Sequence, residues 1–332
     1  MIKKVLIVPY VYEGKKLKFF VGKGTHSGLW RFPTGHVGDK VEFSNESVTQ
    51  GARRELGEEL GIKNTKNFFF TGIRQTFKQS HKNIKRNGQV EESIFATDIT
   101  GLKILLDKKE FSEYKILSLQ EALKILHYNS HKKILLNTNK KVLNKKYPKI
   151  FLLVGPSGSG KGVIIKSLLS DKSISIAKAK TATTRPRRTT EIDERLFVTE
   201  KEFKRMDQDG KFIEKNLFGG YWYGSVKENV EQILENLTNV IIEIDLNGVK
   251  SFKKLFSNTV SIFINVNLEE LKQRLSQRNT ETIDAIEKRL DIARIEIQNS
   301  NICDFVVENK QGKLNITVEK IKKIIRKNDG KK

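Results

Sequence analysis

The chain of 332 residues contains a single cysteine, Cys303. An internal disulfide needs two cysteines, so none forms within the chain, and no group of Cys and His residues has the spacing of a zinc site. The sequence also lacks an apolar run near the roughly 18 residues that span a membrane. The apolar residues 1–9 give way to polar ones from Glu13, before the core of a signal peptide is complete. These absences predict a cytoplasmic protein without membrane contact.

Acidic residues are outnumbered by basic ones. The chain has 39 Asp and Glu against 62 Lys and Arg, which gives a formal net charge of +23. Such an excess attracts phosphate groups, whether on nucleotides or on nucleic acid. The lysines are scattered along the chain, and the one dense basic run, near residue 322 and beyond, is typical of a solvated helix end. Anionic nucleotides are therefore the favoured ligands, and nucleic acid is the alternative.

The length suits two domains of roughly 150 residues each. Between them, the stretch before Pro148 is rich in Lys and Asn and has one apolar cluster, which indicates a connecting helix. We predict a first domain over residues 1–128, a helical linker over 129–148, a second domain over 149–327 and a basic tail over 328–332.

The second domain begins with a phosphate-binding motif. The apolar run 150–154 leads into Gly-Pro-Ser-Gly-Ser-Gly-Lys, which ends at Lys161, and an apolar helical pattern follows. A strand, a glycine-rich turn and a helix N-terminus form a P-loop, whose backbone N–H groups surround phosphate oxygens. The pattern then requires Ser or Thr to contact magnesium, but Gly162 and Val163 offer no hydroxyl group.

The first domain contains a predicted helix with an acidic face. Ser47 and Gln50 have the spacing of a capping box and Gly61 is a stop signal, so we expect a helix from Ser47 to Leu60. At positions i, i+3 and i+4 this helix carries three carboxylates, those of Glu55, Glu58 and Glu59. Like charges at this spacing repel one another unless a cation lies among them, and magnesium prefers oxygen ligands. The pattern predicts a metal site, with a solvated acidic face as the alternative.

This stretch resembles the signature of the Nudix hydrolases. After Glu46 and seven further residues comes Arg-Glu-Leu (residues 54–56). The Glu-Glu pair (58–59) and Gly-Ile (61–62) then complete this part of the pattern. The preceding glycine departs from it, because ten residues instead of five separate Gly35 from Glu46. We interpret this difference as an insertion of about one turn in the loop before the helix.

The Nudix resemblance implies a metal-dependent hydrolase with an α/β/α sandwich and a mixed sheet. Mg²⁺ or Mn²⁺ would be held by Glu55, Glu58 and Glu59, with Glu58 as a catalytic residue and Arg54 orienting the carboxylates. A metal-bound water would attack phosphorus in a nucleoside diphosphate linked to another group. Glu91 or Glu92 is the candidate for a further carboxylate, although an exposed strand edge explains both equally well.

A group of arginines follows the P-loop helix. Arg185, Arg187 and Arg188 flank or follow Pro186, and three guanidinium groups so close together suit bidentate capture of a second phosphate. Later strand patterns alternate with helical ones, which predicts a parallel sheet with its site at the carboxyl ends of the strands. The order of these motifs resembles the guanylate kinases over residues 149–327.

This second resemblance implies phosphoryl transfer from ATP to GMP on a P-loop kinase fold with a parallel sheet and a helical lid. ATP would be bound by Gly155, Ser157, Gly158, Ser159, Gly160, Lys161 and Gly162. GMP would be bound by Thr181, Arg185, Arg188, Arg195, Glu214, Tyr223, Ser225 and Asp245, with Glu214 and Ser225 reading the guanine. The residues implied to neutralise the transferring phosphoryl group are Lys161, Arg274, Arg278 and Arg289.

Two further departures leave other interpretations open. Thr190 stands where the kinases have glycine, and Arg195 aligns with their phosphate-binding tyrosine. The second domain could therefore phosphorylate another acceptor or only bind nucleotide, while the Nudix domain processes RNA 5′ ends. An inactive scaffold would be expected to lack several of the binding residues, but the chain keeps Lys161, Arg185, Arg188, Glu214 and Tyr223. We therefore favour a bifunctional nucleotide enzyme.

Overall fold

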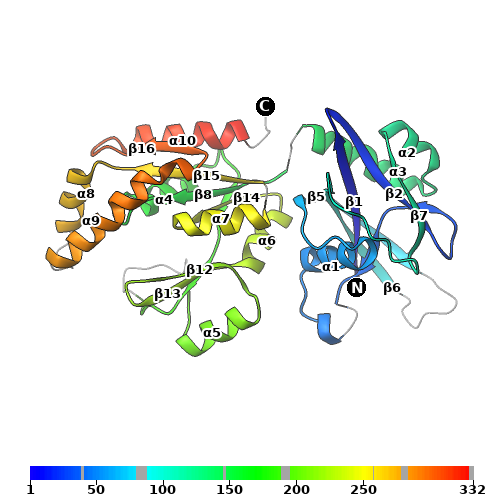
Figure 1. Ribbon diagram of the computed structural model, residues 1–332, viewed down its shortest axis with the longest axis horizontal. Coiled ribbons are helices and arrows are strands. Elements are labelled where there is room, and N and C mark those ends of the chain that lie inside the picture. Colours follow the sequence, from blue (N-terminus) through cyan, green and yellow to red (C-terminus); the bar gives the residue numbers. More distant parts are fainter. Residues whose placement is uncertain are drawn as a thin grey trace. The chain divides into compact units, whose positions relative to one another are not determined.

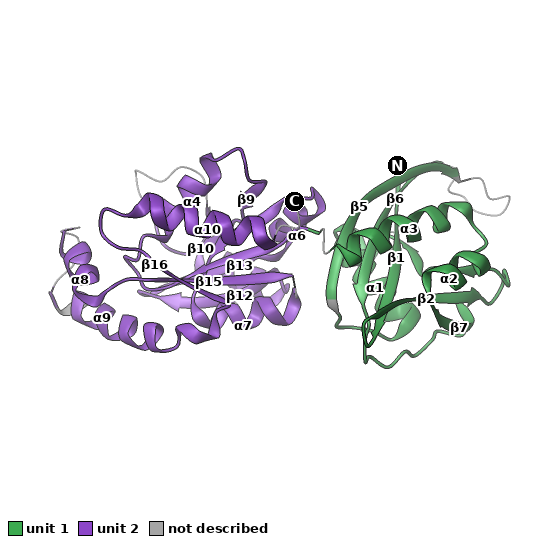
Figure 2. Cartoon of the chain, turned by 90° about the horizontal axis from the view of Figure 1, so that it is seen from above, with its two compact units in different colours: residues 1–147 green, residues 148–332 purple. Residues whose placement is uncertain are grey.

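The computed structural model describes residues 1–38, 41–79, 88–144, 147–187, 195–256, 258–277 and 283–328. They form two compact units, Met1–Tyr147 and Pro148–Lys332, which Figure 2 draws in separate colours. Each unit combines helices with strands, so the predicted α/β class is confirmed. None of the described helices has the length and apolar character that crossing a bilayer requires.

Unit 1 is built on a seven-stranded sheet of order β3-β2-β1-β6-β5, with β4 on β1 and β7 on β2. β1 runs parallel to β6 and antiparallel to β2 and β4, so the predicted mixed sheet is confirmed. The strands, visible in Figure 1, are β1 (Ile2–Glu13), β2 (Lys16–Gly24), β3 (Trp30–Arg31), β4 (Thr34–His36), β5 (Lys66–Gln79), β6 (Gly88–Asp98) and β7 (Phe111–Leu117).

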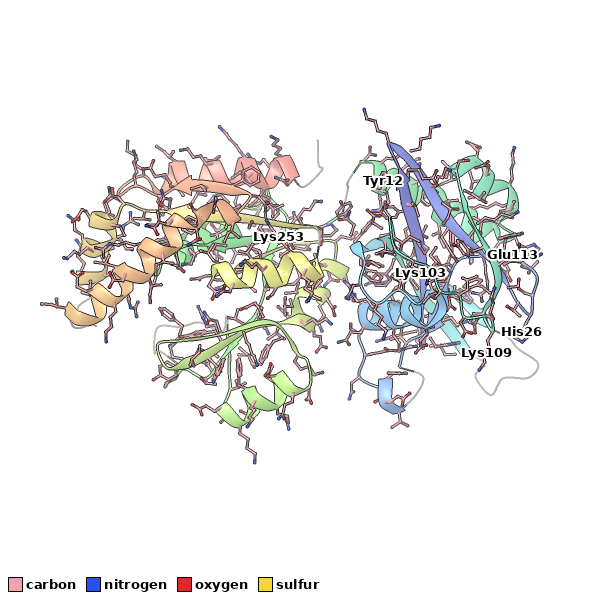
Figure 3. All side chains as sticks on the ribbon, in the orientation of Figure 1. Tyr12, His26, Lys103, Lys109, Glu113 and Lys253 are labelled. Carbon is pink, nitrogen blue, oxygen red and sulfur yellow. The ribbon has the colours of Figure 1, made fainter. Side chains whose placement is uncertain are left out.

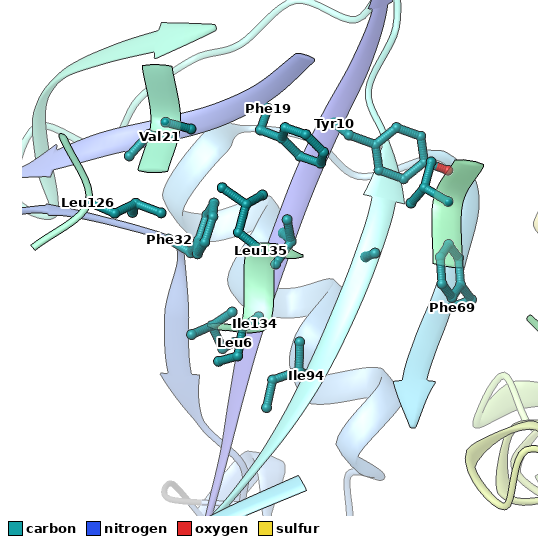
Figure 4. Close-up of a cluster of buried hydrophobic side chains, with 14 of the residues drawn as sticks. Leu6, Tyr10, Phe19, Val21, Phe32, Phe69, Ile94, Leu126, Ile134 and Leu135 are labelled. Atoms are coloured by element: carbon teal, nitrogen blue, oxygen red, sulfur yellow. The ribbon is translucent and has the colours of Figure 1, made fainter. Parts of the chain in front are cut away.

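Each face of this sheet has its own apolar core, because successive side chains of a strand point to opposite faces. Val5 and Ile7 pack with Leu56 of α1, whereas Leu6 of the same strand packs with Leu135 of α3. Figure 4 shows the second of these cores. The helices are α1 (Val48–Leu60), α2 (Leu119–Ile125) and α3 (Asn129–Leu143).

Helix α3 lies in the segment that the sequence indicated as a linker. It buries Ile134, Leu135 and Val142 in the core of unit 1, and this unit continues to Tyr147. The segment is helical, and its apolar residues cover one face of the sheet. The Lys and Asn residues that suggested a linker alternate with those buried positions along the helix.

Unit 2 contains a five-stranded sheet of order β16-β15-β8-β14-β9, in which every pairing is parallel, as predicted. β8 lies in the middle and is fully buried, which explains its unbroken apolar sequence. The strands are β8 (Ile150–Val154), β9 (Ile176–Lys178), β14 (Asn239–Glu243), β15 (Thr259–Asn265) and β16 (Phe305–Glu308). Two apolar cores cover the sheet, one containing residues of α4 (Lys161–Ser170) and α10 (Leu314–Asn328), the other of α6 (Lys227–Glu235) and α7 (Leu246–Leu255).

A second, four-stranded sheet of order β11-β10-β13-β12 belongs to the same unit. Its strands are β10 (Thr181–Thr183), β11 (Arg195–Phe197), β12 (Phe212–Phe218) and β13 (Tyr221–Val226), and α5 (Glu200–Gln208) packs on it through Phe203 and Trp222. Helices α8 (Leu268–Ser276) and α9 (Ile283–Gln298) share a small core of their own. Figure 1 shows β12 and β13 beside α7.

The positive charge is spread over both units. Exposed lysines such as Lys103 and Lys109 lie on unit 1, and Lys253 of unit 2 forms an ion pair with Asp304 at 2.8 Å (Figure 3). Positive residues therefore occur on separate elements, in keeping with the scattered lysines of the sequence.

Candidate active sites

The acidic helix of unit 1 begins and ends as predicted. Ser47 is the N-cap of α1, its side chain accepts from the backbone N–H of Gln50, and the Gln50 side chain completes the capping box. Gly61 ends the helix with φ of 69°, a left-handed conformation that glycine adopts without strain. These two caps set the register that places the glutamates on the helix.

Gly35 lies on β4, close to the acidic helix. A Cβ atom at Gly35 would lie 1.8 Å from Cδ of Glu55, so a larger residue there would force the Glu55 side chain to move. The strand that carries the predicted signature glycine therefore lies directly against the first glutamate of the acidic face, even though the connection to Glu46 is longer than the Nudix pattern.

Arg54 is the centre of the acidic network. Its guanidinium lies 2.9 Å from Oε1 of Glu46, 2.8 Å from Oε1 of Glu55 and 3.0 Å from Oε2 of Glu58. It also donates to the carbonyl oxygen of His36 at 2.7 Å. The arginine thus orients the carboxylates, as the Nudix resemblance implied, and supplies the positive charge among them.

Glu59 differs from its neighbours because its side chain is buried, with an exposed fraction of 3%. Burial raises the pKa of Glu59 to about 9, against the opposing effect of Arg31, and the nearby carboxylates of Glu110 and Glu55 add to the rise. Its Oε2 atom makes no hydrogen bond with the described residues. A divalent cation would remove both penalties, so this carboxylate fits a metal ligand.

The described residues contain no group of three His, Cys, Asp or Glu side chains already arranged to hold a metal ion. Glu55 and Glu58 both pair with the guanidinium of Arg54. Glu92, one of the two candidates for a further carboxylate, is buried on β6, accepts from Nε2 of Gln75 at 2.6 Å and lies opposite Lys4. Glu91 is half-buried on the same strand.

The P-loop of unit 2 joins β8 to α4. Gly155, Gly158 and Gly160 all have positive φ values, and a Cβ atom at Gly155 would lie 2.6 Å from the carbonyl oxygen of Ile264. Nζ of Lys161 donates to the carbonyl oxygens of Gly155 at 2.6 Å and Pro156 at 3.0 Å. The loop is therefore a tight turn that holds its own lysine at the helix N-terminus.

Gly162 is the second residue of α4 and departs from the P-loop pattern. It has no positive φ, and a Cβ atom there would meet no heavy atom within 4 Å. The position can accept a side chain, so the missing hydroxyl group is not imposed by crowding or by the backbone.

A cavity of about 260 Å³ lies beside the P-loop. From the P-loop it is lined by Gly155, Ser157 and Lys161. The predicted acceptor residues that line it are Thr181, Arg195, Glu214, Tyr223 and Asp245. Residues from separate strands and from the phosphate-binding loop thus meet around one volume.

Glu214, which lines this cavity, forms a hydrogen-bonded pair with the buried Ser225. Oγ of Ser225 donates to Oε1 of Glu214. Burial raises the pKa of Glu214 to about 6, the bond from Ser225 opposes this rise, and nearby Asp245 adds to it. Glu214 can therefore carry its charge at neutral pH and still accept hydrogen bonds from a ligand.

The predicted phosphate-binding arginines take different places. The guanidinium carbon of Arg195 lies 5.7 Å from the ring centroid of Tyr223, and both residues line the cavity. Arg185 is not among the lining residues: its guanidinium donates to the carbonyl oxygen of Pro186 and lies 5.7 Å from the ring centroid of Phe197. Arg188 and Thr190 lie outside the described residues.

The three arginines of the helical segment also differ from one another. Nη1 of Arg289 donates to Oγ of Ser157 at 2.9 Å, which brings this side chain to the P-loop. Arg274 instead donates to the carbonyl oxygen of Asn309 and pairs with Glu270 at 3.2 Å, so its guanidinium lies away from the cavity lining. Arg278 lies outside the described residues.

Several residues of the site were not found from the sequence. Asn216, Phe218 and Glu296 line the cavity, and the side chain of Asn309 donates to the carbonyl oxygen of Ser159 at 2.8 Å. The alternation of β12, which puts residue 216 on the face of Glu214, could have indicated Asn216. No local pattern marks Glu296, because it reaches the cavity from a distant helix.

Comparison with known proteins gives two family matches. A family model described as guanylate kinase matches residues 147–328, and one described as NUDIX domain matches residues 4–138. The guanylate kinase of Prochlorococcus marinus subsp. pastoris is 38% identical over 185 residues, which cover 55% of this chain and 99% of that protein.

Two further similarities concern unit 2. The guanylate kinase of a Bacillus cereus strain is 37% identical over 179 residues, which cover 53% of this chain and 86% of that protein. The crystal structure of guanylate kinase from Anaplasma phagocytophilum shares 27% of its sequence, with a TM-score of 0.46, and the match covers 56% of this chain and 88% of that one.

Proposed function

The chain belongs to the guanylate kinase family and also carries a Nudix domain, and on this premise we propose that it has two separate nucleotide activities. Unit 2 transfers a phosphoryl group from ATP to GMP, and unit 1 hydrolyses a nucleoside diphosphate derivative with Mg²⁺ or Mn²⁺. The observation that carries the kinase proposal is the cavity that both Lys161 of the P-loop and Glu214, the hydrogen-bond acceptor of Ser225, line.

In the kinase site, different cavity residues bind different parts of the acceptor nucleotide. The charged carboxylate of Glu214 accepts from guanine N1–H and N2–H, and the O–H of Ser225, which here donates to Glu214, turns to donate to O6 when guanine binds. Arg195 and Tyr223 hold the acceptor phosphate, with Arg185 and Arg188 as further proposed ligands. Lys161 and Arg289, both at the P-loop, neutralise charge on the transferring phosphoryl group. Asp245 supports the acceptor from the start of α7.

Arg274 and Arg278 complete the proposed set around the transferring group. In the present arrangement Arg274 bonds to the backbone of Asn309, whose side chain in turn holds Ser159. Arg274 therefore supports the P-loop through Asn309, and contact with the phosphoryl group would require its guanidinium to leave that position.

In unit 1, the metal would be held by Glu55, Glu58 and Glu59, and a divalent ion bound there would supply an activated water for attack on phosphorus. Arg54 keeps two of these carboxylates oriented toward one another. Glu59 is buried near Arg31 and Glu110, and a divalent ion would offset the cost of its buried charge. The leaving group and the nucleoside of the substrate would be selected by residues outside this helix.

The pH dependence of GMP binding tests the guanine assignment. Because the pKa of Glu214 is raised to about 6, the carboxyl takes up a proton as pH falls through that value and can no longer accept from both guanine donors. We expect GMP affinity to drop between pH 7.5 and pH 5, measured by calorimetry. The phosphate of GMP also titrates near pH 6, so the control is Glu214→Gln, which keeps only the phosphate contribution. An identical pH profile in both proteins would contradict the assignment.

Because Gly162 has no hydroxyl group, we expect the kinase to need a higher magnesium concentration than it would with Ser or Thr at this position. A hydroxyl at this position contributes one oxygen to the ion, worth on the order of 1–3 kcal/mol. Since a Cβ atom at Gly162 meets nothing within 4 Å, Gly162→Ser should fold normally. We expect this variant to reach its half-maximal rate at a lower magnesium concentration. Unchanged magnesium dependence in a folded variant would show that the hydroxyl is not limiting.

A further inference from the structure

Asn216 lies in the acceptor cavity without a role in the scheme above. It follows Glu214 by two residues on β12, and both residues line the same cavity. Lys215, between them, points to the other face, where it pairs with Asp207 and lines a different cavity with Trp222. The strand therefore presents two polar side chains in sequence along the acceptor site.

The pairing of β12 with β13 places these two side chains at different positions along the cavity wall. Glu214 bonds to Ser225, whereas Asn216 stands opposite Tyr223. Asn216 therefore lies further along β12 than Glu214, on the side of the proposed phosphate-binding Tyr223. In a nucleoside monophosphate the group between base and phosphate is the ribose.

Asp245 fixes the side chain of Asn216. Oδ1 of Asp245 accepts from the backbone N–H of Gly248 at 2.7 Å, which caps α7, and Oδ2 accepts from Nδ2 of Asn216. A carboxamide has two N–H groups and one carbonyl oxygen, and the bond to Asp245 uses one of those N–H groups. The amide is thus held at the wall of the cavity by a residue that is itself held by a helix.

We propose that Asn216, positioned by Asp245, contacts the ribose hydroxyl groups of the acceptor nucleotide and makes the site selective for a ribonucleotide. The amide can accept from one hydroxyl and donate to another, so both the 2′ and the 3′ positions are suitable partners. This inference rests on the proposed kinase function and extends it from the base and the phosphate to the sugar.

Equilibrium binding without ATP tests the inference apart from catalysis. We expect calorimetric titration to show that the chain binds GMP roughly five- to hundredfold more tightly than 2′,3′-dideoxy-GMP, the effect of two hydrogen bonds. In Asn216→Ala the two affinities should become equal through weaker binding of GMP, while the affinity for the dideoxy ligand stays the same. That unchanged affinity also shows that the variant is folded.

Lys215→Ala is the matched control, because it truncates the neighbouring side chain on the opposite face and should keep the preference for GMP. Equal binding of both ligands by the unaltered chain would overturn the inference. So would an Asn216→Ala variant that loses affinity for both ligands by the same factor, since Asn216 would then act only on the structure of the site. Failure to bind either ligand would instead contradict the proposed kinase function.

Discussion

Lys161→Ala should remove ATP-dependent phosphorylation of GMP and leave hydrolysis by unit 1 unchanged. The ammonium group lies at the N-terminus of α4, bonded to two carbonyl oxygens of its own loop, and has an exposed fraction of 8%. Its proposed task is to neutralise charge on the phosphates, and loss of one such preorganised group costs roughly 10²- to 10³-fold in rate. A coupled assay of ADP formation measures the loss.

The control for this variant is Lys166→Ala, which removes the same charge from an exposed position of the same helix. It should keep the rate within a few-fold. If Lys166→Ala were as inactive as Lys161→Ala, the effect would come from α4 as a whole and not from the phosphate-binding lysine. If Lys161→Ala stayed active, the P-loop would not be the donor site.

Glu58→Gln should abolish hydrolysis and leave phosphorylation of GMP within a few-fold. Glu58 is one of the three proposed metal ligands, and it is the more exposed of the two that pair with Arg54, at 3.0 Å with a side chain that is 49% exposed. The amide removes a negative charge from the metal site while it keeps the shape. The loss should exceed the roughly 10- to 100-fold that even an outer residue of a metal site costs. Phosphate or nucleotide release with magnesium measures it.

Glu13→Gln is the matched control for the acidic helix. Glu13 is the exposed last residue of β1, where it pairs with Lys16 of β2, and it is far from α1 in the sequence. It should hydrolyse substrate at the unaltered rate. Loss of both activities in a folded Glu58→Gln variant would contradict the assignment of the two reactions to separate units.

Local features of the fold were predictable from the sequence because they depend on near neighbours. The capping box at Ser47, the stop at Gly61 and the glycines of the P-loop each follow from residues within a few positions of one another. The buried strand β8 was predictable from its unbroken apolar run. Helix α3 was only partly predictable, because its polar composition hid the apolar residues that pack on the sheet.

The remaining features depend on side chains that are far apart in the sequence. Arg274 was expected to face the phosphoryl group, but the structure shows it bonded to Asn309, 35 residues away. Asn216 and Asp245, separated by 29 residues, meet only because β12 lies beside the start of α7. Local sequence motifs cannot indicate such pairs, since each partner alone is an ordinary polar residue.

The acceptor preference of the intact chain tests the central claim most directly. GMP, AMP and UMP would be supplied at matched concentrations with ATP and magnesium, and formation of each diphosphate would be followed. We predict that GDP forms fastest, because the charged carboxylate of Glu214 accepts from guanine N1–H, whereas adenine presents an acceptor at that position. Faster phosphorylation of AMP or UMP, or no diphosphate from any acceptor at any magnesium concentration, would contradict the account.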